Sequence, residues 1–247
     1  MTTIVKTTDL SVYYQQTEAL RHISIEIPAG TRVAIVGPNG AGKSTFIKAL
    51  LALIPAQAKQ IELLGTNLAN ARQHIAYVPQ TSEVNWDFPT TVYDVVLMGI
   101  SAKRFGFTRI TAAQHQQVKQ ALEIMDLWDL KDRQIKQLSG GQKQRVFIAR
   151  AIAQQADLYF LDEPLAGVDM KSEALIMAQL QQFQADGKTS ITVHHDLNTV
   201  ASYFDYVVFI NKEVVAHGPV ATTFTTENIQ KTYQHSITLT PLMQQEV

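Results

Sequence analysis

The segment Gly37-Pro-Asn-Gly-Ala-Gly42-Lys43-Ser44 constrains this chain more than any other. It fits the pattern G-x-x-x-x-G-K-S and follows the apolar run Thr31–Val36, which is typical of a strand buried on both faces. Glycines let consecutive backbone N–H groups turn inward and form a cup for phosphate oxygens. A helix that begins at the cup adds the positive end of its dipole. We therefore expect a strand, a phosphate-binding loop and a helix from about Lys43 to Ile54.

The loop also predicts which side chains meet a bound nucleotide. Lys43 brings a cation to the β- and γ-phosphates, and Ser44 offers a hydroxyl to Mg²⁺. This pattern does not choose among kinases, GTPases and ATPases. Asn211-Lys212-Glu213-Val214 is close to the guanine-reading N-K-x-D of GTPases, but Val214 lacks the required carboxylate. We interpret it as a turn before a strand.

Hydrophobic periodicity indicates strands that alternate with helices, which predicts a largely parallel sheet covered on both faces. From about 81 to 155 the pattern is helical, and it includes the capping box Thr111-x-x-Gln114. The other predicted strands are 4–14, 20–27, 60–64, 75–78, 157–161, 189–193 and two near 206–217, with helices at 171–185 and 197–203.

Composition limits the class of protein. The 247 residues carry a net charge of -1, with 21 basic and 22 acidic residues, so a nucleic-acid partner is not expected. The chain has no cysteine, which excludes disulfides and thiolate metal sites. No apolar run approaches the roughly 18 residues needed to span a bilayer, and the N-terminus lacks the features of a signal peptide. We expect a cytosolic globular protein whose membrane role, if any, depends on a partner.

A second element of a nucleotide site is the apolar segment Leu158–Leu161, which ends in two carboxylates, Asp162 and Glu163, before Pro164. In phosphoryl transfer one such carboxylate holds Mg²⁺ and another faces the attacking water. We assign these roles to Asp162 and Glu163, with Glu163 as the general base or at least the residue that polarises the water.

The segment Leu138-Ser139-Gly140-Gly141-Gln142 ends 20 residues before Asp162. With the phosphate loop and the paired carboxylates, it closely resembles the nucleotide-binding subunit of ABC transporters over about residues 4–235. The resemblance implies an α/β fold: a P-loop ATPase core with a mainly parallel sheet, an N-terminal antiparallel β part and an inserted α-helical subdomain. We expect one domain over 1–247, with an α/β core at 1–80 and 156–225, a helical subdomain at 81–155, and a tail at 226–247 that starts with a short helix.

The resemblance also implies site residues. Gln80 matches the Q-loop glutamine that touches Mg²⁺ and the water, His195 the switch histidine on the γ-phosphate, and Asp169 the D-loop aspartate. Tyr14, preferred over Tyr13, matches the aromatic residue that stacks on adenine. The catalytic set is then Glu163, His195 and Gln80, and the Mg²⁺ set is Ser44, Gln80 and Asp162. The ATP-binding set is Tyr14, Gly37, Pro38, Asn39, Gly40, Ala41, Gly42, Lys43, Ser44, Thr45, Ser139, Gly140, Gly141, Gln142 and Asp169.

In the family, the cup at Ser139–Gln142 serves the ATP held by the other subunit. This implies a head-to-tail homodimer with two ATP molecules at its interface, on the cytoplasmic face of a membrane permease. Two positions depart from the family. His194 stands where Ser or Thr is more usual, and Ala166-Gly167 stands where Ser-Ala is common.

Three further segments indicate the cargo. Residues 84–99, 193–197 and 218–229 resemble the corresponding segments of the ATPases that drive manganese, zinc and iron importers. This implies uptake of a divalent metal, manganese foremost, with an extracytoplasmic metal-binding protein as an indirect partner. Trp86 and Phe88 suit either a permease docking groove or packing of the helical part. Another cargo such as an iron chelate remains an alternative, as does a non-transport ABC ATPase. The hypothesis of a small-molecule kinase does not explain the presence of the segment Leu138–Gln142.

Overall fold

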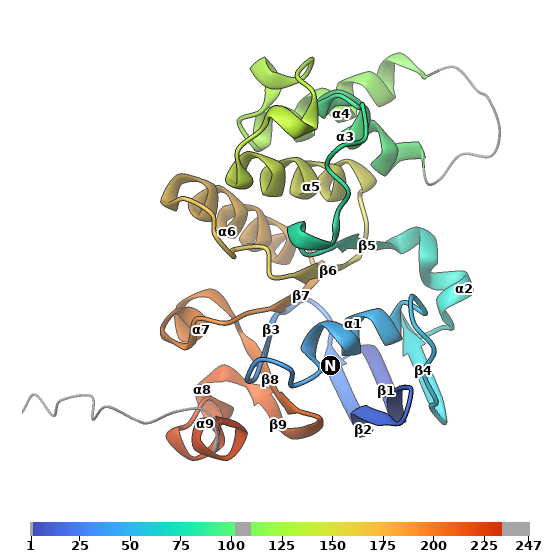
Figure 1. Cartoon of the computed structure of the whole chain (residues 1–247), viewed down its shortest axis with the longest axis vertical. Helices are drawn as coiled ribbons and strands as arrows, with labels where there is room; N and C mark the ends of the chain where they lie inside the picture. Colours follow the sequence, from blue (N-terminus) through green and yellow to red (C-terminus); the bar gives the residue numbers. More distant parts are fainter. Residues whose placement is uncertain (1, 102–109, 234–247) are drawn as a thin grey trace, which may run out of the picture.

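The computed structural model describes residues 2–101 and 110–233, which form two β-sheets flanked by helices (Figure 1). The larger sheet has the order β5-β6-β7-β3-β8-β9. Its first five strands are parallel and β9 is antiparallel to β8. The strands are β3 (Arg32–Val36), β5 (Ile75–Val78), β6 (Leu158–Asp162), β7 (Thr189–Val193), β8 (Tyr206–Asn211) and β9 (Glu213–Pro219). The expectation of a mainly parallel sheet is confirmed.

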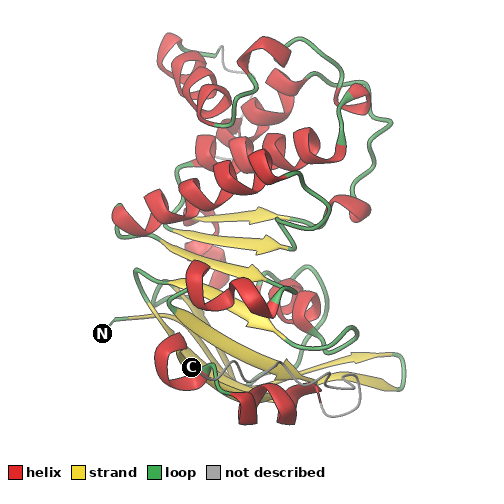
Figure 2. Ribbon diagram, turned by 90° about the vertical axis from the view of Figure 1, so that its left-hand side faces the viewer, coloured by secondary structure: helices red, strands yellow, loops and turns green. Residues whose placement is uncertain are grey.

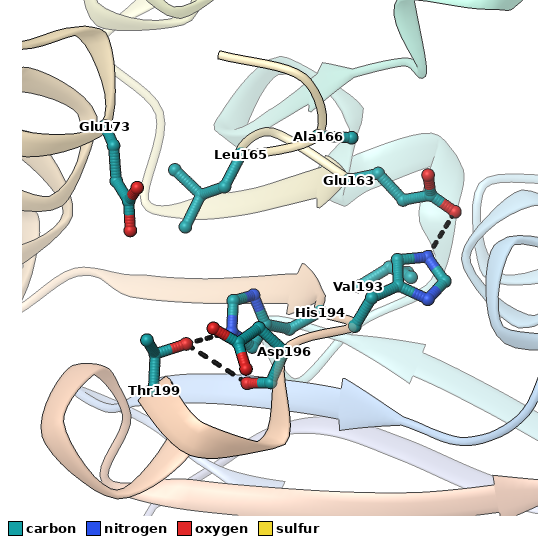
Figure 3. Close-up of a pocket in the computed structure, with 9 residues that line it drawn as sticks. Glu163, Leu165, Ala166, Glu173, Val193, His194, Asp196 and Thr199 are labelled. Carbon is teal, nitrogen blue, oxygen red and sulfur yellow. Dashed lines mark hydrogen bonds and ion pairs between the residues drawn. The ribbon is translucent and has the colours of Figure 1, made fainter. Parts of the chain in front are cut away.

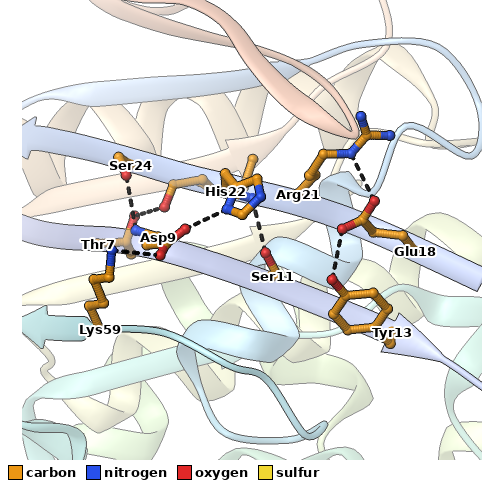
Figure 4. Close-up of polar contacts among 10 residues, drawn as sticks. Thr7, Asp9, Ser11, Tyr13, Glu18, Arg21, His22, Ser24 and Lys59 are labelled. Carbon is orange, nitrogen blue, oxygen red and sulfur yellow. Dashed lines mark hydrogen bonds and ion pairs between the residues drawn. The ribbon is translucent and has the colours of Figure 1, made fainter.

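The smaller sheet is the predicted antiparallel part. Its order is β2-β1-β4, with β1 (Thr3–Tyr14), β2 (Thr17–Pro28) and β4 (Gln60–Leu63). Its outer face carries polar pairs (Figure 4): His22 Nδ1 lies 2.5 Å from Asp9 Oδ1, and the Tyr13 hydroxyl donates to Glu18. The inner face is apolar, because Ile23, Ile25 and Ile27 alternate with exposed residues along β2.

Helices cover both faces of the larger sheet and form a separate group at one end of the molecule, at the top of Figure 2. That group, α3 to α5, lies in sequence between the neighbouring strands β5 and β6, as expected for an insertion. The helices are α1 (Lys43–Leu50), α2 (Leu68–Ala71), α3 (Val92–Ser101), α4 (Ala112–Ile124), α5 (Gly140–Gln154), α6 (Met170–Ala185), α7 (Leu197–Tyr203), α8 (Val220–Thr223) and α9 (Thr226–Tyr233). Short 3₁₀ turns occupy Arg72–His74, Thr81–Glu83, Trp128–Leu130 and Ile135–Gln137.

Three apolar clusters hold these layers together. One joins α3 to α6 with β5 and β6, a second lies between α1, the smaller sheet and the larger sheet, and a third lies under α7 to α9. β6 and β7 are buried at every residue, so the sheet is covered on both faces at its centre. The carboxyl end of β6, which carries Asp162, is therefore held rigidly beside the helix α1.

Three local predictions have clear outcomes. The capping box at Thr111 and Gln114 is present at the start of α4, and the short helix α9 opens the tail. The helix after the phosphate loop is shorter than predicted, because it ends at Leu50 rather than Ile54. Ala52 adopts a left-handed φ of 51°, and Pro55 disfavours a helical conformation at Ile54. The rest of the predicted tail, residues 234–247, lies outside the described residues.

Candidate active site

The loop between β3 and α1 has the shape that its glycines permit. Gly42, the residue before α1, has a φ of 92°, and a Cβ there would lie 2.4 Å from the Leu20 side chain. A Cβ at Gly37 would lie 1.9 Å from the carbonyl oxygen of Ile210. Both contacts are closer than any real Cβ tolerates, so glycine is required at both ends of the loop.

Lys43 points back into this loop. Its ammonium donates hydrogen bonds to the carbonyl oxygens of Gly37 at 2.8 Å and Pro38 at 2.9 Å. The side chain is buried, and burial lowers the pKa of the Lys43 ammonium, while Glu163 and Asp162 favour its charged form. The cation is thus placed on the concave side of the loop, where a phosphate group would lie.

Ser44 and Asp162 form the pair that best fits a magnesium ion. The Ser44 hydroxyl donates to Asp162 Oδ1 at 2.7 Å, and Asp162 is fully buried. Asp162 Oδ2 has no hydrogen-bond partner among the described residues, and burial raises the pKa of this carboxyl group. A buried carboxylate oxygen without a partner beside a hydroxyl matches the oxygen ligands that Mg²⁺ takes in nucleotide sites.

Glu163 follows Asp162 in a left-handed conformation, with a φ of 52° that is unusual for a residue with a side chain. Two side chains from neighbouring strand ends hold its carboxylate. Gln80 Nε2 donates to Oε2 at 2.8 Å, and His195 Nε2 lies 2.5 Å from Oε1. The backbone strain is of the kind that functional sites retain when surrounding contacts fix the conformation.

Two cavities meet at this glutamate. The first, of about 180 Å³, is lined by Asn39–Thr45 together with Glu163 and His195. The second, of about 170 Å³, also has Glu163 and His195 in its wall, and His194 and Thr199 lie on its other side (Figure 3). The Glu163–His195 pair therefore separates the space beside the phosphate loop from a compartment behind it.

The segment predicted to form a second phosphate cup lies at the start of α5. Ser139 and Gln142 form a reciprocal capping box, and Ser139 and Gly140 are exposed. A Cβ at Gly141 would lie 2.7 Å from Asp169 Oδ2, so α5 begins directly against Asp169. Asp169 in turn accepts hydrogen bonds from the Ser172 amide and hydroxyl and caps α6.

The structure brings the loop residues, Asp162, Glu163, Gln80 and His195 together. Ser139–Gln142, Asp169 and Tyr14 do not line the cavity beside the loop. Tyr14 lies at the end of β1 with 50% of its surface exposed, while the Tyr13 hydroxyl is engaged by Glu18. This arrangement is compatible with the choice of Tyr14, and its role stays a prediction.

Sequence reasoning missed two contacts around the site. Lys48 of α1 forms an ion pair with Glu83, which ties the segment after Gln80 to the helix of the phosphate loop. His194 is buried, and its Nε2 lies 2.7 Å from the Thr199 hydroxyl, which itself bonds to the Asp196 carbonyl. No spacing rule connects Lys48 with Glu83. For the His194–Thr199 contact, the only indication in the sequence is the histidine at position 194, where Ser or Thr is more usual.

Trp86 is packed against the apolar cluster of the helical part. Its ring makes an edge contact with Phe147 at 5.4 Å, and its Nε1 donates to the Thr81 carbonyl. Phe88, in contrast, is 60% exposed. Packing thus accounts for Trp86, and Phe88 is left accessible at the surface.

Within residues 2–101 and 110–233, no group of three or more His, Cys, Asp or Glu side chains is arranged to hold a metal ion. In the same ranges, no helix combines the length and apolar character needed to cross a membrane.

The fold and this site define a P-loop nucleotide-hydrolysing protein, because a phosphate loop and a pair of carboxylates meet at one edge of a parallel sheet. Comparison with known proteins narrows the class. The family model described as ABC transporter matches residues 20–166, which is more than half of the chain. The chain belongs to the ABC transporter family, as an ATP-binding subunit with ATPase activity.

Individual relatives cover nearly the whole chain. It is 49% identical to the manganese transport system ATP-binding protein MntB of Listeria monocytogenes, over 91% of this chain and 93% of the relative. It is 45% identical to the zinc transport system ATP-binding protein TroB of Treponema pallidum, over 96% and 89%. Among solved structures, an ABC transporter described as of the metal-chelate type, in an inward-facing conformation, aligns with a TM-score of 0.81. It shares 30% identity and covers 95% of this chain and 90% of its own.

Proposed function

We propose that this chain is the ATPase subunit of an importer for a divalent metal, with manganese as the first candidate and zinc or iron as the others. The proposal is supported by relatives at 45–49% identity that are named for manganese or zinc transport. The chain would act at the cytoplasmic face of the membrane, bound to permease subunits, with a metal-binding protein on the other side. The metal would be cargo and would not need to touch this chain.

The active form we infer is a head-to-tail homodimer. One observation carries this inference: the segment Ser139–Gln142, exposed at Ser139 and Gly140, does not line the cavity that holds the phosphate loop, Glu163 and His195. A helix N-terminus that is open at its first residues is suited to bind phosphate, yet the loop of the same chain already supplies one such cup. If the second cup serves the ATP of a partner, two-fold symmetry places two ATP molecules at one interface.

The residues then have the following roles. The backbone of Gly37–Gly42 and the Lys43 ammonium bind the phosphates, and Tyr14 stacks on the adenine. Ser44, Asp162 and Gln80 would hold Mg²⁺, which neutralises charge on the β- and γ-phosphate oxygens. Glu163 orients the attacking water and accepts its proton. His195 fixes Glu163 and contacts the γ-phosphate, so it also registers the loss of that phosphate.

Hydrolysis would thereby control the dimer. Loss of the γ-phosphate removes contacts to the loop of one subunit and to the cup of the other, which allows the two chains to separate. The permease would convert this opening into transport. Phe88, exposed in the segment after Gln80, is one accessible aromatic for contact with it.

A second cargo, a metal chelate, is favoured by one observation, the 30% identity to the chelate-type transporter. The test is the content of manganese, zinc and iron in cells whose only copy of the chain is wild type or Lys43→Ala, under metal limitation. A selective fall in manganese with Lys43→Ala supports the proposal. Unchanged levels of all three metals would discard the metal-importer proposal and direct the search to other cargoes.

A further inference from the structure

The turn between β8 and β9 touches the phosphate loop. This is the segment Asn211-Lys212 that only partly matches a guanine-reading motif. The Lys212 amide donates to the carbonyl oxygen of Ala41 at 2.9 Å, and the Arg21 amide of β2 donates to the Lys212 carbonyl at 2.7 Å. Lys212 has a φ of 61°, a left-handed conformation that costs free energy in a residue with a side chain. Contacts on both sides of its backbone therefore hold the turn in this shape.

The residue before the turn supports the other end of the loop. A Cβ at Gly37 would lie 1.9 Å from the Ile210 carbonyl oxygen, so these two backbones are in direct contact. Gly37 and Ala41 thus both rest on the short stretch Ile210–Lys212. Any shift of this stretch changes the positions of the backbone groups that form the phosphate cup.

The side chain of Asn211 connects the same stretch to the C-terminal helix α9. Asn211 Nδ2 donates to the Thr232 carbonyl oxygen at 3.0 Å. Carbonyl groups in the last turn of a helix lack partners within the helix, so this amide caps α9. Thr232 is fully buried, and its hydroxyl donates to the Asn228 carbonyl at 2.6 Å, so the capped end is firmly seated.

Tyr233, the residue after Thr232 in α9, lies near the phosphate loop. Burial raises the pKa of the Tyr233 hydroxyl to about 12, and the backbone N–H of Gly37 opposes that rise. The end of α9 and the start of the phosphate loop are therefore neighbours.

We propose that the Asn211-Lys212 turn couples α9 to the phosphate loop, so that docking of α9 and binding of ATP stabilise each other. Asn211 acts as a positioning residue: it holds the turn against α9, and the turn holds Ala41 and Gly37. Linkage makes the effect reciprocal, because a docked α9 raises ATP affinity by the same factor by which ATP favours docking. The proposal rests on Gly37–Thr45 as the site of the ATP phosphates.

The test compares Asn211→Ala with Asn228→Ala. Each removes one side-chain amide that donates to a backbone carbonyl beside α9, but Asn228 bonds to Thr223, away from the loop. Asn211 is exposed, so its replacement is compatible with folding. The readouts are ATP affinity without magnesium, KM and kcat of hydrolysis, and hydrogen exchange of the α9 amides with and without ATP.

We expect Asn211→Ala to raise the Kd for ATP roughly fivefold, which corresponds to about 1 kcal/mol, the net contribution of one hydrogen bond. KM should rise while kcat at saturating ATP stays constant. ATP should slow exchange of α9 amides in the wild type and in Asn228→Ala, but not in Asn211→Ala. Wild-type ATP affinity in Asn211→Ala, or exchange of its α9 amides that ATP still slows, would overturn the coupling. If Lys43→Ala also binds ATP normally, the loop assignment itself has failed.

Discussion

The carboxylate of Glu163 lies 2.5 Å from Nε2 of His195, and these two side chains form the wall between the cavity beside the phosphate loop and the cavity behind it. In the proposed mechanism Glu163 is the general base, and His195, which follows the neighbouring strand β7, holds its carboxylate and can exchange a proton with it. The Glu163–His195 contact therefore links the proposed general base to His195, the residue expected to sense the loss of the γ-phosphate.

Glu163→Gln tests the base assignment. Glutamine has nearly the same shape but cannot accept a proton, so turnover should fall by about a hundredfold or more. ATP binding should persist, because the phosphate loop is unaltered, and a dimer should accumulate with ATP. Steady-state ATPase assays and size-exclusion chromatography measure these effects, with Lys43→Ala as the variant that loses ATP binding. Hydrolysis at the wild-type rate in Glu163→Gln would show that Glu163 is not the base.

Local sequence predicted this side of the site well. The phosphate loop and the Asp162-Glu163 pair directly follow buried strands. Because the carboxyl ends of parallel strands lie at the same edge of a sheet, the sequence places both segments at that edge. What could not be predicted depends on distant contacts or backbone angles. The Lys48–Glu83 ion pair joins residues 35 positions apart, and the left-handed φ of Glu163 is imposed by its partners. The early end of α1 is accompanied by a left-handed conformation at Ala52, and alanine has no preference for that conformation from which it could be predicted.

Gly140 and Gly141 offer a matched pair of substitution sites in Ser139–Gln142, the signature segment of the ABC family. Alanine at Gly141 would place its Cβ 2.7 Å from Asp169 Oδ2 and 3.0 Å from Ser172 Oγ, so the cap of α6 must shift. We expect a loss of about 1–3 kcal/mol in the free energy of unfolding. At Gly140 no described atom lies within 4 Å of the added Cβ, and alanine favours the helix. Urea unfolding should therefore show Gly140→Ala as stable as the wild type or slightly more, and equal losses in both variants would contradict the packing of α5 on Asp169.

His194 gives the chain a predictable response to acid. Burial lowers the pKa of the His194 imidazole below its ordinary 6.5, while Asp196 and Glu173 oppose the shift and His195 adds to it. Between the lowered value and 6.5 the unfolded chain binds more protons than the folded one. Above pH 6.5 the imidazole is neutral in both the folded and the unfolded chain, and its contribution to stability is complete. As the pH falls from 6.5 through the folded pKa, the unfolded chain takes up the proton first, and stability is lost.

The variant His194→Thr should show this directly. The slope of Tm against pH below pH 6.5 should be shallower than in the wild type, because one acid-sensitive group is gone. His217, whose pKa is also lowered by burial, stays in both proteins, so its effect cancels in the comparison. Identical slopes in the two proteins would mean that His194 does not titrate differently on folding.

The head-to-tail arrangement predicts complementation between two inactive variants. Lys43→Ala removes the loop cation, and Ser139→Arg places a bulky charge at the exposed start of α5. Each variant alone should lack ATPase activity, and Gln137→Arg, which adds the same charge at another exposed position, should retain it. In a mixed dimer, the intact loop of the Ser139→Arg chain faces the intact signature of the Lys43→Ala chain. One complete site is therefore rebuilt, and part of the activity should return on mixing. If both cups served the ATP of their own chain, every site in the mixture would be damaged, so a mixture as inactive as its components contradicts the proposed dimer.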